Sequence, residues 1–327
     1  FLKRMYSLLC RLFHILYYNQ KEVPDYQKSK VRKRPVNLKK LARRRMILRI
    51  LAGLIPPIFG GIYAKLEADW LDLSKTSLPF RGIKKGESLK LLHISDLHLS
   101  QSFSSKQIES ALLKGFSESP DACFITGDFI SGIPSKNDLE ELSKVLLKFS
   151  SKIPTYACLG NHDGGLWSSS NGGPKNSNQI RNMLRKARVR LLVNERISLR
   201  IKGIPLQLVG VGDLWSKECF PRLCMTHRSQ RPPKEAVILM CHNPDAKEML
   251  KSYFWNLMLA GHTHGGQFVI PFTKFAPFAP VVDQSMVEGL HQWDKWRHIH
   301  ITRGVGNLYG IRFNCRPEVN LLELVAK

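Results

Sequence analysis

Acidic residues are scarce in this sequence, and the scarcity is uneven along the chain. The 327 residues include 26 Asp and Glu against 50 Lys and Arg, which gives a formal net charge of +24. No acidic residue lies between Asp25 and Glu67, whereas residues 28–49 hold eleven basic ones. Such a positive field favours polyanions, which include nucleic acid, an anionic membrane surface and phosphorylated substrates. Charge alone does not choose among these three.

The sequence also lacks a cysteine pattern with disulfide or zinc-ribbon spacing. Its seven cysteines are scattered, and three of them lie in apolar runs typical of buried strands: Cys123, Cys158 and Cys241. This usage predicts structural thiols in a reducing compartment. There is no internal repeat, and the Gly-, Ser- and Asn-rich stretch at residues 164–178 is the single tract of biased composition.

The N-terminal region lacks an apolar run long enough to cross a bilayer. The uncharged run from Ile50 to Ala64 would reach about 22 Å as a helix, against about 30 Å for the hydrocarbon core. Pro56-Pro57 and Gly60-Gly61 are also expected to break a helix there. Residues 1–18 combine a wide apolar face with a narrow polar stripe. We therefore expect a helical, membrane-associated appendage that lies at the interface.

The polybasic stretch would then bind anionic headgroups, at about 1 kcal/mol per Lys or Arg near the surface. Two alternatives stay open. In one, the apolar segments pack on the catalytic domain and the basic run is a solvated linker. In the other, a true membrane anchor keeps Arg43-Arg44-Arg45 inside and the enzyme outside.

From about residue 88 the pattern changes to short apolar runs that alternate with candidate helices, which predicts an α/β domain. Buried strands are predicted at Leu89–Ile94, Ala122–Thr126, Thr155–Leu159, Leu206–Val211, Val237–Met240 and Leu257–Ala260, with later strand-rich segments at Arg297–Thr302 and Val319–Val325. Helices are predicted at Lys106–Phe116, Leu139–Phe149 and Ile180–Ala187. We divide the chain into a membrane-associating region, residues 1–80, and a catalytic domain, residues 81–327.

Polar side chains follow the predicted strands at the point where each strand ends. They are Asp96 and His98, then Asp128, then Asn161, His162 and Asp163, then His242, and finally His262 and His264. Such loop positions at one edge of a sheet are where α/β proteins build their sites. Singly, Asp-x-His and Gly-Asp are common and mostly structural, whereas the run Gly-His-Thr-His-Gly-Gly at 261–266 is rare. Together and in order, they predict a site.

These residues have the composition of a site for two divalent cations about 3.5–4 Å apart. Asp96 and His98 turn toward one point, Asp128 is the candidate bridging carboxylate, and Asn161 offers a neutral oxygen. The donors are oxygen and nitrogen, so Mn²⁺, Fe, Zn²⁺ and Mg²⁺ are admissible, and we favour Mn²⁺. A water bridging the metals would lose a proton near neutral pH and attack phosphorus in line.

His162 is the candidate catalytic residue beside the ligands, and it would protonate the leaving oxygen or stabilise the transition state. Asp163 is expected to hold the His162 imidazole in the required tautomer. Arg303 and Arg312 are candidates to clamp substrate phosphate, although Gly304-x-Gly306 is equally a plain turn. Trp167, Trp215 and Trp255 are candidates to stack a uracil, but tryptophan in an apolar context is usually core, so we do not assign them to the site.

The motif series D-x-H, G-D, G-N-H-D, H and G-H-x-H, met from Asp96 to His264, resembles that of the calcineurin-like metallophosphoesterases. The resemblance covers residues 88–327 and implies a four-layer α/β/β/α double β-sandwich. It implies that Asp96, His98, Asp128 and His264 surround one metal. It places Asp128, Asn161, His242 and His262 around the other, with His162 as the catalytic histidine.

Within that family the chain resembles the membrane-associated bacterial branch, and most narrowly the UDP-diacylglucosamine pyrophosphatases of lipid A synthesis. This implies hydrolysis of UDP-2,3-diacylglucosamine to UMP and 2,3-diacylglucosamine 1-phosphate by a peripheral enzyme on the cytoplasmic face of the inner membrane. The partners would be an anionic membrane surface and the lipid-linked nucleotide sugar, with no obligate nucleic acid. Because residues 164–178 and 213–233 look too short and polar for a large lid, we expect the apolar N-terminal segments to cover the acyl chains.

Two rival functions are carried alongside this one. A phosphodiesterase acting on nucleic acid or a small nucleotide would also suit the charge. The other is a non-catalytic membrane scaffold with a degenerate site. A degenerate site should have lost at least one metal-ligand residue, and this sequence has the full set. The sequence leaves the oligomeric state open.

Overall fold

The computed structural model of this chain describes residue 46 and residues 59–327, and residues 55–327 form one compact unit. The predicted amphipathic segment at residues 1–18 lies outside the described residues, as does the polybasic stretch apart from Met46. Within the described part of the chain, no helix has both the length and the apolar character that crossing a bilayer requires.

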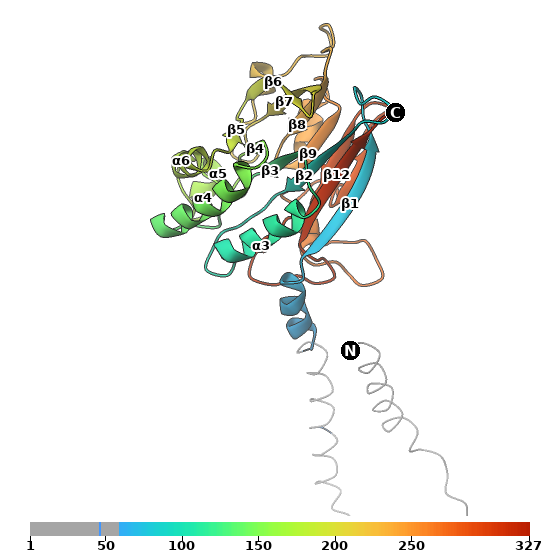
Figure 1. Cartoon of the computed structure of the whole chain (residues 1–327). Helices are drawn as coiled ribbons and strands as arrows, with labels where there is room; N and C mark the ends of the chain where they lie inside the picture. Colours follow the sequence, from blue (N-terminus) through green and yellow to red (C-terminus); the bar gives the residue numbers. More distant parts are fainter. Residues whose placement is uncertain (1–45, 47–58) are drawn as a thin grey trace, which may run out of the picture. The chain divides into compact units, whose positions relative to one another are not determined.

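Two six-stranded sheets form the centre of the unit (Figure 1). The first has the order β1-β12-β2-β3-β4-β5, built from β1 (Asp72–Pro79), β2 (Ser88–Ile94), β3 (Ala122–Thr126), β4 (Thr155–Cys158), β5 (Arg190–Leu191) and β12 (Glu318–Val325). The second has the order β10-β11-β9-β8-β7-β6, built from β6 (Glu195–Ile201), β7 (Ile204–Gly210), β8 (Ala236–Met240), β9 (Leu257–Ala260), β10 (Gly289–Gln292) and β11 (His298–Ile301). Strands β2 to β5 run parallel, and so do β7, β8, β9 and β11.

The sheets pack against each other through side chains that alternate along their strands. Leu89 and Leu91 of β2 join Ile238 of β8 and Leu257 of β9 in one buried cluster. The intervening side chains, among them Leu92, face the outer side of the first sheet. A sandwich core between the two sheets results.

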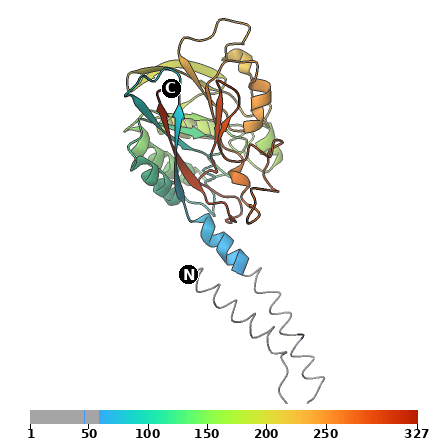
Figure 2. The same ribbon diagram turned by 90° about the vertical axis from the view of Figure 1, so that its right-hand side faces the viewer.

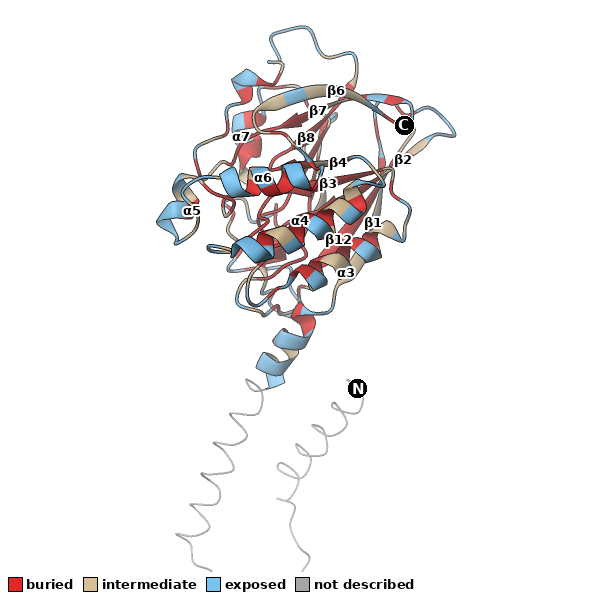
Figure 3. Cartoon of the chain, turned by 60° about the vertical axis from the view of Figure 1, so that its left-hand side comes forward, coloured by how far each residue is buried: buried red, intermediate tan, exposed pale blue. Residues whose placement is uncertain are grey.

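Helices cover the outer face of the first sheet, and Figure 3 shows their buried residues in red on the side that faces it. These helices are α3 (Ser105–Phe116), α4 (Lys136–Ser150) and α6 (Asn178–Lys186). The outer face of the second sheet packs on connecting loops and short helical turns: η1 (Pro221–Leu223), η2 (Pro244–Ala246) and α7 (Lys247–Leu250). The predicted α/β class and two-sheet sandwich are confirmed, with one outer layer thinner than the other.

Helix α4 illustrates how local sequence sets these elements. Ser135 accepts a hydrogen bond from the Asp138 backbone N–H at 3.1 Å, and the Asp138 carboxylate accepts one from the Ser135 N–H at 3.2 Å, so the two form a capping box. Four apolar side chains with helical spacing are buried against the sheet: Leu139, Leu142, Leu146 and Phe149. The cap and the apolar face together fix where the helix begins and which side it buries.

The structure corrects the predicted domain boundary at residue 80. Strand β1 pairs with β12 along its whole length, from Asp72 opposite Glu318 to Pro79 opposite Val325, so residues 72–80 belong to the catalytic domain. Residues 59–68 are helical. The prediction that Gly60-Gly61 break a helix here is therefore wrong. The helix packs on the domain: the Arg312 N–H donates to the Ala64 carbonyl at 2.9 Å, and Tyr63 contacts Phe313 edge to face. Figure 2 shows it in blue at the base of the domain.

Candidate metal centre

Loops at the carboxyl ends of five central strands, drawn from both sheets, bring the predicted ligands together. Asp96 and His98 follow β2, Asp128 follows β3, Asn161 follows β4, His242 follows β8, and His262 and His264 follow β9. All seven side chains are buried. The sandwich therefore places the carboxyl ends of the parallel strands of both sheets against each other, and the site lies where they meet.

Three groups of side chains in the described residues hold their donor atoms within metal-binding distance of one another; His98, Asp128 and His162 form one of them, and the other two consist of predicted ligands alone. Of these two, one is Asp96, His98 and His264, and the other is Asp128, His242 and His262. Asp128 lies between them, because its Oδ2 is 3.2 Å from His242 Nε2 and 3.6 Å from His98 Nε2. This is the position of a bridging carboxylate. The ligand roles themselves stay predictions.

The hydrogen bonds show that the donors fit a cation. His242 Nδ1 lies 2.6 Å from the Thr126 carbonyl oxygen and must donate to it, which leaves Nε2 facing Asp128 Oδ2. His262 Nε2 likewise donates to the Pro280 carbonyl at 3.2 Å, so its Nδ1 lone pair faces His242 Nε2 at 3.3 Å. The buried Asn161 Oδ1 has no hydrogen-bond partner. Imidazole nitrogens and oxygens that converge in this way are an arrangement that a divalent cation satisfies.

The electrostatics of the residues point the same way. Burial lowers the pKa of His262 to about 3, so this imidazole is neutral, as a metal ligand must be. Burial would lower the pKa of His242 as well, but the adjacent Asp128 carboxylate raises it to about 10. Burial would raise the pKa of Asp96, and the facing imidazoles, His264 first, lower it below its ordinary value. The proton on His242 thus occupies the place that a cation would take.

Backbone conformation adds a second mark of function. Five of the seven predicted ligands adopt the left-handed region, with φ values of 53° at Asp96, 45° at His98, 55° at Asp128, 70° at His262 and 51° at His264. Such strain in non-glycine residues clusters at functional sites. The glycine of the G-N-H motif is needed for a different reason, because a Cβ on Gly160 would overlap the Asp128 carboxylate.

Asp163 has a different role from the one predicted. Its two carboxylate oxygens accept hydrogen bonds from the backbone N–H groups of Asp128, Phe129 and Gly160 at 2.7–2.9 Å, so they orient loops and do not hold the His162 imidazole. Burial and the Asp128 charge raise the pKa of Asp163 to about 7, and the backbone hydrogen bonds oppose that rise. Asp163 joins the loop after β3 to the loop after β4.

The expectation that Arg303 and Arg312 clamp phosphate is also corrected. Arg312 is fully buried, and its guanidinium donates to backbone carbonyls of His264, Arg303, Gly304 and Gly306. Arg303 pairs with three carboxylates, those of Asp72, Glu288 and Glu318. Both arginines thus hold the loops behind the site, and Arg312 fixes the His264 segment.

We expect Arg312→Met to destabilise the protein by about 3 kcal/mol or more, because it leaves several buried carbonyls without donors. Urea unfolding measures this loss, with Arg200→Met, at an exposed arginine of β6, as the control that stays near wild type. A phosphate clamp would behave otherwise: KM would rise and stability would be unchanged.

Two tryptophans that the sequence analysis excluded from the site lie in it. Trp167 and Trp215 line a cavity of about 470 Å³ together with Asp128, Asn161 and His162. The Trp167 ring lies 4.8 Å from the His162 ring, and the Trp215 ring lies 4.2 Å from that of His262. Trp215 lies in a turn after β7, and Trp167 lies in the short helix α5 (Leu166–Ser170) that follows the G-N-H-D motif; this closeness to strand ends was the available signal. Trp255, in contrast, is core.

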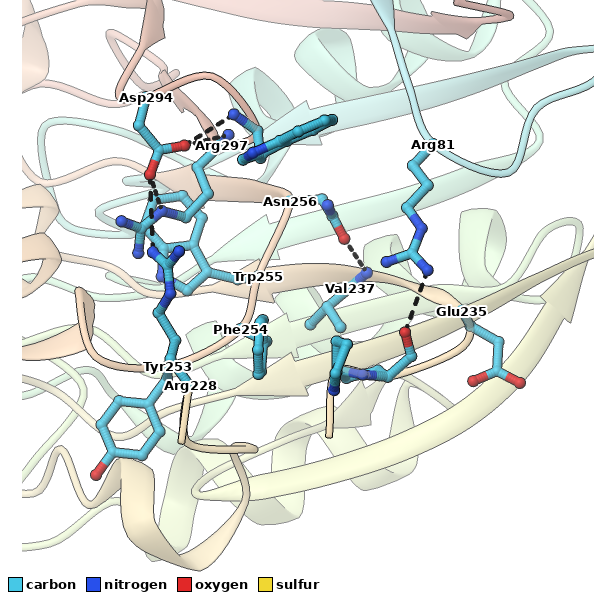
Figure 4. A pocket seen from close by; sticks show the side chains of 13 residues that line it. Arg81, Arg228, Glu235, Val237, Tyr253, Phe254, Trp255, Asn256, Asp294 and Arg297 are labelled. Carbon is cyan, nitrogen blue, oxygen red and sulfur yellow. Dashed lines mark hydrogen bonds and ion pairs between the residues drawn. The ribbon is translucent and has the colours of Figure 1, made fainter. Parts of the chain in front are cut away.

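A second cavity, of about 280 Å³, lies near the start of β8 and β9, at the opposite end of these strands (Figure 4). Its charged groups are paired with the protein itself. Arg297 contacts Asp294 at 2.8 Å, and Arg81 donates to the carbonyls of Pro233 and Lys234. We assign it no part in the chemistry of the metal centre.

Comparison with known proteins agrees with this geometry. The calcineurin-like phosphoesterase family matches residues 89–266. The phosphodiesterase YaeI of Escherichia coli is 36% identical over 288 residues, which cover 87% of this chain and 100% of that protein. The UDP-2,3-diacylglucosamine pyrophosphatases LpxG of Chlamydia muridarum and Chlamydia trachomatis are 28% and 27% identical, covering 84% and 72% of this chain and 95% and 83% of their own. The chain belongs to the calcineurin-like phosphoesterases, a family of metal-dependent hydrolases.

Proposed function

We propose that this enzyme hydrolyses the pyrophosphate of UDP-2,3-diacylglucosamine, giving UMP and 2,3-diacylglucosamine 1-phosphate. The observation that carries the proposal is the aromatic wall of the metal-centre cavity, formed by Trp167 and Trp215. Base stacking on such rings is worth about 1–3 kcal/mol, and the volume lies in the range of ligand pockets, about 300–1,000 Å³. The two LpxG relatives support the same substrate.

The residues have distinct parts in this reaction. Divalent cations, which we propose to be Mn²⁺, would supply Lewis acidity and lower the pKa of a water molecule. Their holders are the two groups around Asp128, with Asn161 as a further oxygen donor. His162 lines the cavity beside the ligand residues, where its imidazole is placed to exchange a proton with the leaving oxygen.

We further propose that the enzyme works at the cytoplasmic face of the bacterial inner membrane. A diacylated substrate keeps its chains in the bilayer and its pyrophosphate at the surface. The eleven basic residues at 28–49 favour an anionic lipid surface. A second candidate function is that of a phosphodiesterase acting on nucleic acid or a small nucleotide. The 36% sequence identity to the Escherichia coli phosphodiesterase YaeI favours this candidate.

An assay of the Mn²⁺-loaded full chain against three substrates tests these assignments. We expect UMP release from UDP-2,3-diacylglucosamine at a kcat/KM well above that for bis-p-nitrophenyl phosphate or single-stranded DNA, and no release by Asp128→Asn. Preference for DNA, or for a small nucleotide diester over the lipid, would replace our substrate with the second candidate.

A further inference from the structure

Exposed apolar side chains gather in two segments that border the metal-centre cavity. They come from the loop between β9 and β10 and from the segment before β12, and we call the following set the apolar rim: Phe268, Phe272, Phe275, Phe278, Tyr309 and Ile311. Phe278 and Tyr309 line the cavity itself and are 73% and 91% exposed, while Phe272 is fully exposed. Residues of this size in water at one place mark an interaction surface.

The rim has an ordered base. Four small side chains of the same region form a buried cluster of their own: Ala276, Ala279, Val281 and Val287. The backbone is tied to the domain as well, since the Val269 N–H donates to the Phe313 carbonyl at 2.9 Å. The loop thus buries its small apolar residues and presents its large aromatic ones to solvent.

A row of aromatic contacts joins the rim to the helix of residues 59–68. The ring centroid of Tyr63, on the helix, lies 5.6 Å from that of Phe313. The Phe313 ring stacks on the Phe268 ring with 5.0 Å between centroids, and the Phe268 centroid lies 6.0 Å from that of Phe278 at the cavity. The outer face of the same helix exposes three more apolar side chains, Phe59, Ile62 and Leu66. One apolar surface therefore extends from this helix to the metal centre.

The charge of the chain indicates what covers this surface. Lys65 and Lys274 are exposed on the helix and on the loop, and the polybasic stretch at residues 28–49 lies shortly before the helix in sequence. Aromatic side chains flanked by basic ones are the composition of surfaces that lie in the headgroup region of anionic bilayers. A soluble protein partner would not by itself require this concentration of basic residues.

We infer that the apolar rim and the outer face of helix 59–68 dock on an anionic lipid bilayer and open the metal-centre cavity directly onto the membrane surface. The inference rests on the proposed action on a lipid-linked substrate and extends it, because it assigns membrane contact to residues of the catalytic domain. Phe278 and Tyr309 would lie at the boundary between lipid and cavity. An acyl-bearing substrate could then present its pyrophosphate without leaving the bilayer.

Vesicle co-sedimentation of the full-length protein tests this inference. The double variant Phe272→Ser/Phe275→Ser removes two rim side chains that do not line the cavity, and Phe220→Ser/Leu223→Ser removes two exposed apolar side chains outside the rim. Vesicles of phosphatidylethanolamine and phosphatidylglycerol are used at low salt and at about 1 M salt, where the Debye length is about 3 Å. High salt screens the polybasic stretch, which is the same in all variants.

We expect the rim variant to lose at least about tenfold in partition coefficient at high salt, given the transfer energy of two phenylalanine side chains. The control variant should bind as wild type does, and both should hydrolyse bis-p-nitrophenyl phosphate normally. Equal binding by all three proteins would overturn the inference. So would a wild-type dimer in sedimentation velocity that the rim variant dissociates, since the surface would then be covered by a second copy.

The same proteins separate this inference from the proposed substrate. Rim-dependent vesicle binding without UMP release would reject UDP-2,3-diacylglucosamine and leave the docking surface standing. UMP release with undiminished vesicle binding by the rim variant would do the reverse.

Discussion

Asp128→Asn is expected to reduce kcat for bis-p-nitrophenyl phosphate by about a thousandfold or more. The Asp128 carboxylate lies between the two groups of donors, 3.2 Å from His242 Nε2 and 3.6 Å from His98 Nε2, so its charge serves both. An amide keeps the shape but offers one neutral oxygen in place of a carboxylate. Bound manganese, measured by mass spectrometry after dialysis, should fall from two ions per chain.

The matched control is Asp69→Asn, the same chemical change at an exposed aspartate, which should leave both activity and metal content at the wild-type level. Thermal unfolding in the presence of chelator checks that both variants fold. Full activity in Asp128→Asn, with two ions retained, would show that Asp128 does not bridge the metals.

His162→Ala should lower kcat by about 10²- to 10⁴-fold, the usual contribution of a general acid. The imidazole lines the cavity and is half-buried, whereas the seven predicted ligands are buried. If it protonates the leaving oxygen, the loss will be larger for a dinucleotide, whose leaving alkoxide needs a proton, than for bis-p-nitrophenyl phosphate. The ratio of the two losses is the measurement.

Metal content decides between two roles for His162, because its ring also lies within metal-binding distance of His98 and Asp128. We expect the variant to keep both ions. Loss of one ion would make His162 a ligand, and equal losses on the two substrates would exclude proton donation. His227→Ala, at an exposed histidine, is the control for histidine removal.

The strands that the sequence did not reveal are the edges of the two sheets: β1, β5, β6 and β10. A central strand has paired strands on both sides, the sandwich core on one face and an outer layer on the other. Both of its faces are therefore apolar, and its sequence stands out as an apolar run. An edge strand pairs on one side and is partly solvated. In β6 the burial alternates between half-buried and exposed positions until Ile201, and no apolar run marks it.

The sequence also identified the candidate ligands, since each of the seven lies within a few residues of the end of a central strand. Their convergence follows once the strands pair in parallel. The sequence misassigned Asp163 and Arg312. The Asp163 carboxylate accepts hydrogen bonds from backbone N–H groups, and the Arg312 guanidinium donates to backbone carbonyls. Whether such a residue faces a cavity or the backbone depends on packing between segments far apart in sequence.

By itself, then, the sequence determined the chemistry: oxygen and nitrogen donors at strand ends, an α/β sandwich and a family of metal-dependent hydrolases. Only the tertiary structure decided which residues surround that chemistry. The Asn314 backbone N–H bonds the Glu67 carboxylate, 247 positions away, and this contact helps set the helix of residues 59–68 beside the apolar rim. Short-range patterns report backbone pairing and burial, because these repeat every two to four residues. Contacts between distant loops have no period, so the tryptophans of the cavity, the buried arginine and the exposed aromatic rim became visible only in the folded chain.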